Sequence, residues 1–436
     1  MIRYVLAFCA TIAGTTAFAA VDIQEVTSDG GITAWLVEDH NIPFTALEIR
    51  IRGGASLDEE GKRGATNLMM GLLEEGAGEM DAQAFQTRRE ELSASYGFDT
   101  GDDMISVSAQ FLTENRDEAV DLLRLALVEP RFDETAVERV RAQVLAGISR
   151  AEKSPNEIAS EAFFASAFPD DPYGTPLRGT TDSVTALSRA DIVTAWQNAL
   201  VQDRIYVGAV GDITPEALGD VLDRLLGDLP QSGPPLPGPV DVQIDGGISV
   251  VDFPTPQSVA LFGHEGMDRD DPDYFAATIL NEALGAGGFE SRLMDEVREK
   301  RGLTYGVSTY LVPKDRAALV LGSVASANGS IAEAVDVIRD EWARIAEEGM
   351  TQEELDRVKL FLTGAYPLRF DGNANIASIL VGMQMIDLPR DYVANRNDYI
   401  EAVTLDDVNR VAAELYNPEA LRFTVVGTPE GLAETP

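Results

Sequence analysis

The residue types that most often bind metals or act as nucleophiles are scarce in this sequence. It contains two histidines, His40 and His264, and a single cysteine, Cys9. Zinc needs three or four converging nitrogen, sulfur or oxygen ligands. The two histidines lie far apart in the chain, each near the end of a predicted strand, where a lone histidine is more often structural than a ligand. We therefore expect neither histidine to bind a metal.

The N-terminus has the pattern of a secretory signal peptide. Arg3 supplies one positive charge, residues 4–13 are apolar, and residues 17–20 are small or apolar at cleavage spacing. No later stretch approaches the ~20 apolar residues of a membrane helix. Residues 1–20 are thus predicted to be removed and the mature protein to be periplasmic or secreted, without membrane insertion. Cys9 would leave with the signal, so no disulfide is expected in the mature chain.

The charge of the chain is strongly negative. It has 34 Lys and Arg against 73 Asp and Glu, a net charge of −39. Nucleic-acid binding needs a basic patch that neutralises phosphates, so nucleic acid is not an expected partner. An acidic, solvated surface keeps an exported protein soluble. A preference for basic peptides is the weaker alternative.

A linker rich in proline and glycine, residues 229–247, divides the chain into two bodies, residues 21–228 and 248–436. The two bodies have similar patterns. The first is predicted to contain strand 44–51, helices 65–75 and 81–93, strand pair 98–111 and helix 114–128. The second is predicted to contain strand 259–264, helices 271–284 and 291–300, strand pair 303–324 and helix 330–348, with Asp271 and Pro272 as the start of its first helix.

The repetition extends to residue detail. Residues 132–140 resemble residues 350–358, with Val137 and Leu355 in equivalent places, which indicates an internal duplication. Apolar residues alternate along 105–109, as in a strand with one buried face, and recur every three or four residues along 331–345, as in an amphipathic helix. The predicted fold class is α+β, with two homologous domains, each a mostly antiparallel sheet with helices packed on one side.

Three stretches carry a resemblance to a known family: residues 53–64, residues 171–176 and residues 285–305 (GAGGFESRLMDEVREKRGLTY). Over essentially the whole mature chain, the sequence resembles the pitrilysin/insulinase family of zinc peptidases. The resemblance implies two halves that form a clam shell. Active members of that family carry the motif H-x-x-E-H and, further along the chain, a glutamate as the third zinc ligand.

The zinc motif is lost here. By analogy with the family, its five positions hold Asn67, Leu68, Met69, Met70 and Gly71, and Gly147 stands where the third ligand belongs. Asn67 offers one weak oxygen, Met70 cannot act as a base, and neither glycine has a side chain. The resemblance therefore implies no zinc and no other cofactor in this chain.

The family's Arg/Tyr pair is retained as Arg298 and Tyr305. In the family this pair reaches a substrate peptide at the zinc site of the opposite half, and a guanidinium and a phenol are suitable donors to an oxyanion. Gly285, Gly287 and Gly288 precede the arginine and would allow a peptide to approach the backbone. Outside this context, Arg298 would be an ordinary cation at a helix end and Tyr305 an ordinary strand residue.

Two functions follow from the resemblance. The first is a non-catalytic, substrate-binding subunit of a heterodimeric zinc metallopeptidase that cleaves peptides or unfolded segments. Its partner would be a homologous subunit with H-x-x-E-H and the zinc ion, and the present chain would be inactive alone. The alternative is a catalytically inactive binding or scaffold protein of the same fold.

Overall fold

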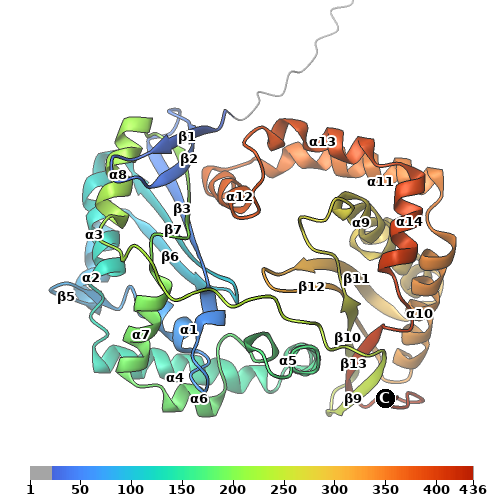
Figure 1. Ribbon diagram of the computed structural model, residues 1–436. Coiled ribbons are helices and arrows are strands. Elements are labelled where there is room, and N and C mark those ends of the chain that lie inside the picture. Colours follow the sequence, from blue (N-terminus) through green and yellow to red (C-terminus); the bar gives the residue numbers. More distant parts are fainter. Residues whose placement is uncertain (1–21, 436) are drawn as a thin grey trace, which may run out of the picture.

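The computed structural model describes residues 22–435. The predicted signal peptide lies outside this range. Two α+β bodies face each other, with their helices largely on the outside (Figure 1). None of the helices within the described range is long and apolar enough to cross a membrane.

The N-terminal body is built on a six-stranded sheet in the order β1-β2-β8-β3-β7-β6. All neighbours are antiparallel except β2 and β8, which are parallel. The strands are β1 (Gln24–Thr27), β2 (Thr33–Glu38), β3 (Phe44–Arg52), β6 (Ser95–Thr100), β7 (Met104–Leu112) and β8 (Ile205–Gly211). A two-residue pair, β4 (Gly76–Ala77) and β5 (Met80–Asp81), stands apart from this sheet.

The C-terminal body has a five-stranded sheet in the order β11-β12-β10-β13-β9, with β13 and β9 parallel. Its strands are β9 (Gly247–Asp252), β10 (Gln257–Glu265), β11 (Thr304–Pro313), β12 (Ala318–Ala327) and β13 (Arg422–Gly427). In each sheet a hairpin at one edge, β6–β7 or β11–β12, is followed by one strand, β3 or β10, and then by a parallel pair, β8–β2 or β13–β9. This shared topology agrees with the predicted internal duplication.

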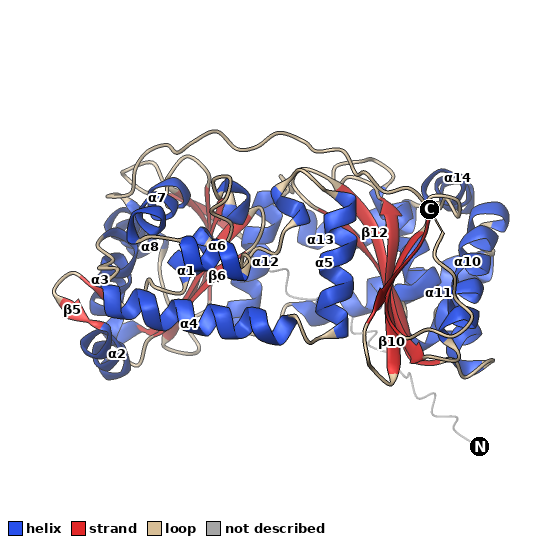
Figure 2. Ribbon diagram, turned by 90° about the horizontal axis from the view of Figure 1, so that it is seen from below, coloured by secondary structure: helices blue, strands red, loops and turns tan. Residues whose placement is uncertain are grey.

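The outer face of each sheet is covered by helices of its own half (Figure 2). In the N-terminal half the helices are α1 (Ala65–Met70), α2 (Ala82–Glu91), α3 (Arg116–Val128), α4 (Glu134–Ala151), α6 (Thr181–Ala186), α7 (Arg189–Ala199) and α8 (Pro215–Leu226). In the C-terminal half they are α9 (Tyr274–Asn281), α10 (Ile331–Glu348), α11 (Gln352–Ala365), α13 (Tyr392–Ala402) and α14 (Leu405–Leu415). The predicted apolar face of α10, from Ile331 through Trp342 to Ile345, is buried.

The inner face of each sheet receives one helix from the other half. Helix α5 (Pro155–Ala167) packs on β10 and β13, and α12 (Asn373–Met385) packs on β8 and β3 (Figure 1). The approach of α12 requires Gly208, because a methyl group there would lie 2.6 Å from the carbonyl oxygen of Ala377. The predicted arrangement, a sheet with helices on one side, holds for the helices that belong to the same half as the sheet. It did not include the helix that each half contributes to the other half's sheet. The exchange also explains why β10 is buried at every residue from Ser258 to His264, since both of its faces are covered.

Ion pairs join the β11–β12 turn of the C-terminal half to the β6–β7 turn and to the loop after residue 167 in the N-terminal half. Lys314 lies 2.7 Å from Asp102, and the Nη1 of Arg316 donates to Asp171 at 2.9 Å. Residues 229–246 contain no helix or strand but follow this junction, since the amide of Val240 donates to the carbonyl oxygen of Arg316 at 2.9 Å.

Two predicted element boundaries are wrong. The helix expected over 65–75 ends at Met70, where Gly71, a poor helix former, caps it and turns follow. Asp271 does not cap the next predicted helix, because α9 begins two residues later than expected, after Asp273. Instead, the Asp271 carboxylate accepts the amide of Asp273 at 2.8 Å, in a turn that leads into the helix.

Candidate functional site

Arg298 and Tyr305 meet at one surface depression of about 510 Å³. Arg298 lies near the end of the π-helix η6 (Met294–Glu299), and Tyr305 is the second residue of β11, which is the edge strand of its sheet. The chain reverses between them at Gly302, whose φ of 65° favours glycine. Short π-helices occur frequently at functional sites, because their extra residue redirects side chains.

The polar ends of both side chains are available to a ligand. Tyr305 is 86 % exposed, and neither residue's side chain donates a hydrogen bond within residues 22–435. The carboxylate paired with Arg298 is that of the adjacent Glu299, 3.6 Å away and half-exposed. The guanidinium lies over the ring of Phe289, 4.4 Å from its centroid, which orients Arg298 without consuming its N–H groups.

The three predicted glycines differ in their surroundings. Gly285 is buried, and a methyl group there would lie 2.5 Å from the hydroxyl of Thr309 on β11, so this glycine serves close packing beneath the surface. A methyl group at Gly287 would lie 2.7 Å from the carbonyl oxygen of Glu282. Gly288 has a φ of 57° and open space around it. Of the three, Gly288 is therefore the position most accessible to a peptide backbone.

Phe289 was not anticipated from the sequence, and it is 66 % exposed, which is unusual for a phenylalanine. If it orients Arg298, Phe289→Ala should lower the kcat/KM of an Arg298-dependent reaction about two- to fivefold, the worth of an exposed cation–π contact. Phe289→Trp should restore the rate, because an indole provides the same surface. Equal rates for the alanine and tryptophan variants would argue against this positioning role.

The residues at the zinc-motif positions do not fit a metal. Met70 is a core residue, 1 % exposed, and Asn67 is half-buried on the same short helix α1. Gly71 packs near Val140 of α4, and Gly147 lies further along α4 without a side chain to offer. Within residues 22–435, no three His, Cys, Asp or Glu side chains are grouped so that they could hold a metal ion.

The two histidines have structural environments. The Nε2 of His264 accepts the indole N–H of Trp342 at 2.9 Å, and its Nδ1 lies 2.6 Å from the carbonyl oxygen of Glu265. These two contacts fit the neutral ring with its proton on Nδ1, and burial lowers the pKa of His264. His40 is exposed, and hydrogen bonds to Asp212 and Glu38 raise its pKa.

The buried histidine predicts a pH dependence of stability. Below about pH 6.5 the His264 side chain of the unfolded chain binds a proton, whereas in the folded chain it stays neutral to a lower pH. The free energy of unfolding therefore falls as the pH falls. His264→Gln should flatten this decline between pH 6.5 and 5.5, as measured by the melting temperature. His40→Asn is the control, because the raised pKa of His40 places its effect above pH 6.5. Parallel curves for wild type and His264→Gln would contradict the prediction.

Two of the stretches that resemble the known family meet at a structural junction. Arg63 is buried, and its guanidinium donates to the carbonyl oxygen of Thr175 at 2.9 Å and to Asp102 at 2.7 Å. These contacts tie residues 53–64 to residues 171–176. The same junction holds the ion pairs between the halves, so both stretches maintain the architecture.

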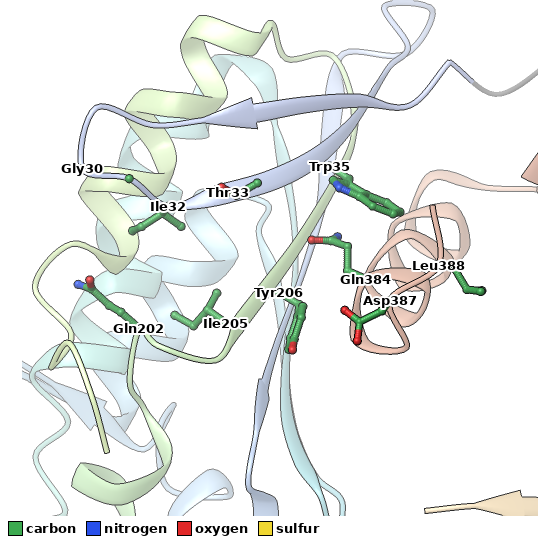
Figure 3. A pocket seen from close by; sticks show the side chains of 11 residues that line it. Gly30, Ile32, Thr33, Trp35, Gln202, Ile205, Tyr206, Gln384, Asp387 and Leu388 are labelled. Atoms are coloured by element: carbon green, nitrogen blue, oxygen red, sulfur yellow. The ribbon is translucent and has the colours of Figure 1, made fainter. Parts of the chain in front are cut away.

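A second depression of about 510 Å³ lies between the β1–β2 turn and the end of α12. Figure 3 shows Tyr206, Gln384 and Asp387 around it. The side-chain amide of Gln384 donates to the carbonyl oxygen of Val207 at 2.8 Å, which links α12 to β8. None of the predicted site residues lies here.

The fold and the site together define a duplicated, two-domain protein of peptidase architecture that lacks the metal-binding residues of such enzymes. Residues 34–181 match the family model described as insulinase (peptidase family M16), and residues 186–362 match the model described as peptidase M16 inactive domain. These two models of one family together match most of the chain. The protein belongs to the M16 family of peptidases and their homologues.

Relatives and solved structures agree with this assignment. The chain is 26 % identical to a non-peptidase homolog, YmxG, of Helicobacter pylori, over 89 % of this chain and 90 % of that protein. It is also 26 % identical to an uncharacterized zinc protease of Streptomyces coelicolor, over 90 % and 87 % of the two chains. A crystal structure of a peptidase M16 inactive domain from Pseudomonas fluorescens superposes with a TM-score of 0.87 at 26 % identity, covering 95 % of this chain and 99 % of that one.

Proposed function

We propose that this chain is the non-catalytic, substrate-binding subunit of a heterodimeric zinc metallopeptidase that cleaves peptides or unfolded segments. Its partner is a homologous chain that carries H-x-x-E-H and the zinc ion. The chain works outside the cytoplasm, after removal of residues 1–20. The observation that carries the proposal is the convergence of Arg298 and Tyr305 on one open depression, where neither side chain donates a hydrogen bond to residues 22–435.

The proposed chemistry divides between two chains. The partner's metal would activate water and polarise the scissile carbonyl. Arg298 and Tyr305 would donate to the peptide oxygen as it acquires negative charge, and a donor aimed at developing charge stabilises the transition state more than the ground state. Open space at Gly288 gives the peptide backbone room to pass beside Arg298.

The alternative is an inactive binding or scaffold protein. It is favoured by the replacement of every zinc-motif position and by the name of the Helicobacter pylori relative. A scaffold would not need Arg298 and Tyr305 to converge at an accessible surface with hydrogen-bond donors free for a ligand.

The deciding experiment is peptide hydrolysis by the purified mature chain with zinc, alone and mixed with an H-x-x-E-H homologue from the same source. Activity confined to the mixture is the expected result. Activity of this chain alone would point to a metal site that the sequence comparison missed. If the two chains associate but the mixture is no more active than the homologue alone, the result favours the binding or scaffold function.

A further inference from the structure

A third cavity, of about 480 Å³, lies where α12 meets helices α9 and α13 and strand β3. We call it the arginine cavity, because four arginines line it: Arg50, Arg269, Arg369 and Arg396. Among residues 22–435 no aspartate or glutamate lines it, although acidic residues outnumber basic ones about two to one in the whole chain. Its volume lies within the range of small-molecule sites.

Few carboxylates neutralise the positive charges of the arginines in this cavity. Arg50 is held by Glu48 at 3.1 Å and by the hydroxyl of Ser378 at 2.7 Å. Arg269, Arg369 and Arg396 form no ion pair with a carboxylate within residues 22–435. Three uncompensated guanidinium groups around one small cavity repel one another, and a bound anion would remove that cost.

The cavity also has aromatic walls. Arg269 stacks on Tyr274 at 4.3 Å from the ring centroid, and Arg396 stacks on Tyr366 at 4.6 Å. Stacking leaves the edge N–H groups of a guanidinium free to donate, and in Arg396 one of them, Nη1, donates to the carbonyl oxygen of Leu362 at 2.9 Å while the others can face a ligand. Tyr392 is a third phenol in the wall, and no hydroxyl of the three has a hydrogen-bond partner in the described chain. Burial raises the pKa of Tyr366 to about 12, so its hydroxyl is a donor at neutral pH.

The wall also has an aliphatic part, with Ile379, Met383 and Leu388 among the lining residues, and a smaller neutral polar part formed by Thr278, Asn375 and Ser378. A small inorganic anion would satisfy the arginines but leave the aromatic and aliphatic surfaces without a contact. A ligand with both an anionic group and an apolar body would satisfy both kinds of surface.

We propose that the arginine cavity binds a carboxylate that carries an aromatic or aliphatic side chain, the chemistry of an apolar residue with a free C-terminal carboxylate. Arg369 and Arg396 would hold the carboxylate, and Tyr274, Phe275 and Tyr366 would receive the side chain. Such a group occurs in small acylated amino acids and at the ends of peptides. This site is independent of the function proposed for Arg298 and Tyr305.

The test is calorimetric titration of the mature chain with N-acetylphenylalanine and with its uncharged amide. The acid should bind at least tenfold more tightly than the amide, since a charge-assisted hydrogen bond is lost in the amide. Its affinity should fall as salt is raised. The tetrapeptide Ala-Ala-Ala-Phe with a free C-terminus distinguishes the two sources: binding at least as tight as that of the small acid indicates a peptide end, and absence of binding indicates a small acid.

Arg369→Gln should weaken binding of the acid about tenfold or more. Arg369 is exposed and its side chain makes no hydrogen bond in the described chain, so the variant should fold normally, and its melting temperature verifies this. Arg390→Gln is the matched control, because Arg390 is close in sequence, is absent from the cavity wall and should change the affinity less than twofold. The proposal is overturned if acid and amide bind alike, if neither binds, if only inorganic phosphate binds, or if Arg369→Gln binds like the wild type.

Discussion

Replacing Arg298 with alanine is expected to lower peptide turnover by the reconstituted two-chain complex about a hundredfold, the usual effect of removing one donor to an oxyanion. Tyr305→Phe removes a single hydroxyl and should have an effect of the same order. Both losses should appear in kcat, because the donors act on charge that develops after the peptide has bound. The measurement is steady-state hydrolysis of a quenched fluorescent peptide.

Two matched variants control for these substitutions. Tyr310→Phe removes a hydroxyl from the same strand, at a residue that does not line the depression. Lys300→Gln removes an exposed cation two residues from Arg298, also outside the depression. Both controls should retain nearly full turnover. If Arg298→Ala and Tyr305→Phe behave as these controls do, the pair has no role in the reaction.

Much of the fold could be predicted because its signals are local. The alternation around Val107 identified a strand with one buried face, and the spacing from Ile331 to Ile345 identified the buried side of α10. The position of Val137 relative to Leu355 revealed the duplication. It also relates the two exchanged helices, since Pro155 and Asn373 are separated by the same 218 residues as that pair.

Other features depend on contacts that no local pattern encodes. Helices α5 and α12 lack the strong amphipathic pattern of α10, and nothing in their residues says which sheet they cover. The arginine cavity draws Arg50 from one half and Arg269, Arg369 and Arg396 from three separate segments of the other. The stacking of Phe289 on Arg298 likewise depends on how η6 folds back on the preceding loop. Only the three-dimensional arrangement reveals these sites.

The exchange of helices predicts that the two halves unfold together. Phe163 of α5 belongs to the N-terminal half, is 1 % exposed, and lies in a hydrophobic cluster with Val259, Leu261 and Val426 of the C-terminal sheet. Phe163→Ala should therefore lower the free energy of unfolding by about 3–5 kcal/mol. Hydrogen exchange should show the loss of protection in β10 and β13, although the substitution lies in the other half.

The two halves are coupled in unfolding by the packing of the exchanged helices, and not only by the covalent linker. Each sheet has an apolar inner face that its own half leaves uncovered, so separating the halves would expose both faces to water. Urea unfolding followed by hydrogen exchange should thus give one transition for both sheets, and Leu368→Ala, at a residue 77 % exposed, should leave its midpoint unchanged. Two separate transitions, or loss of protection confined to the N-terminal half in Phe163→Ala, would mean that the halves are independent. A single transition would mean that the two halves, including the sheet that carries Tyr305, form one cooperative folding unit.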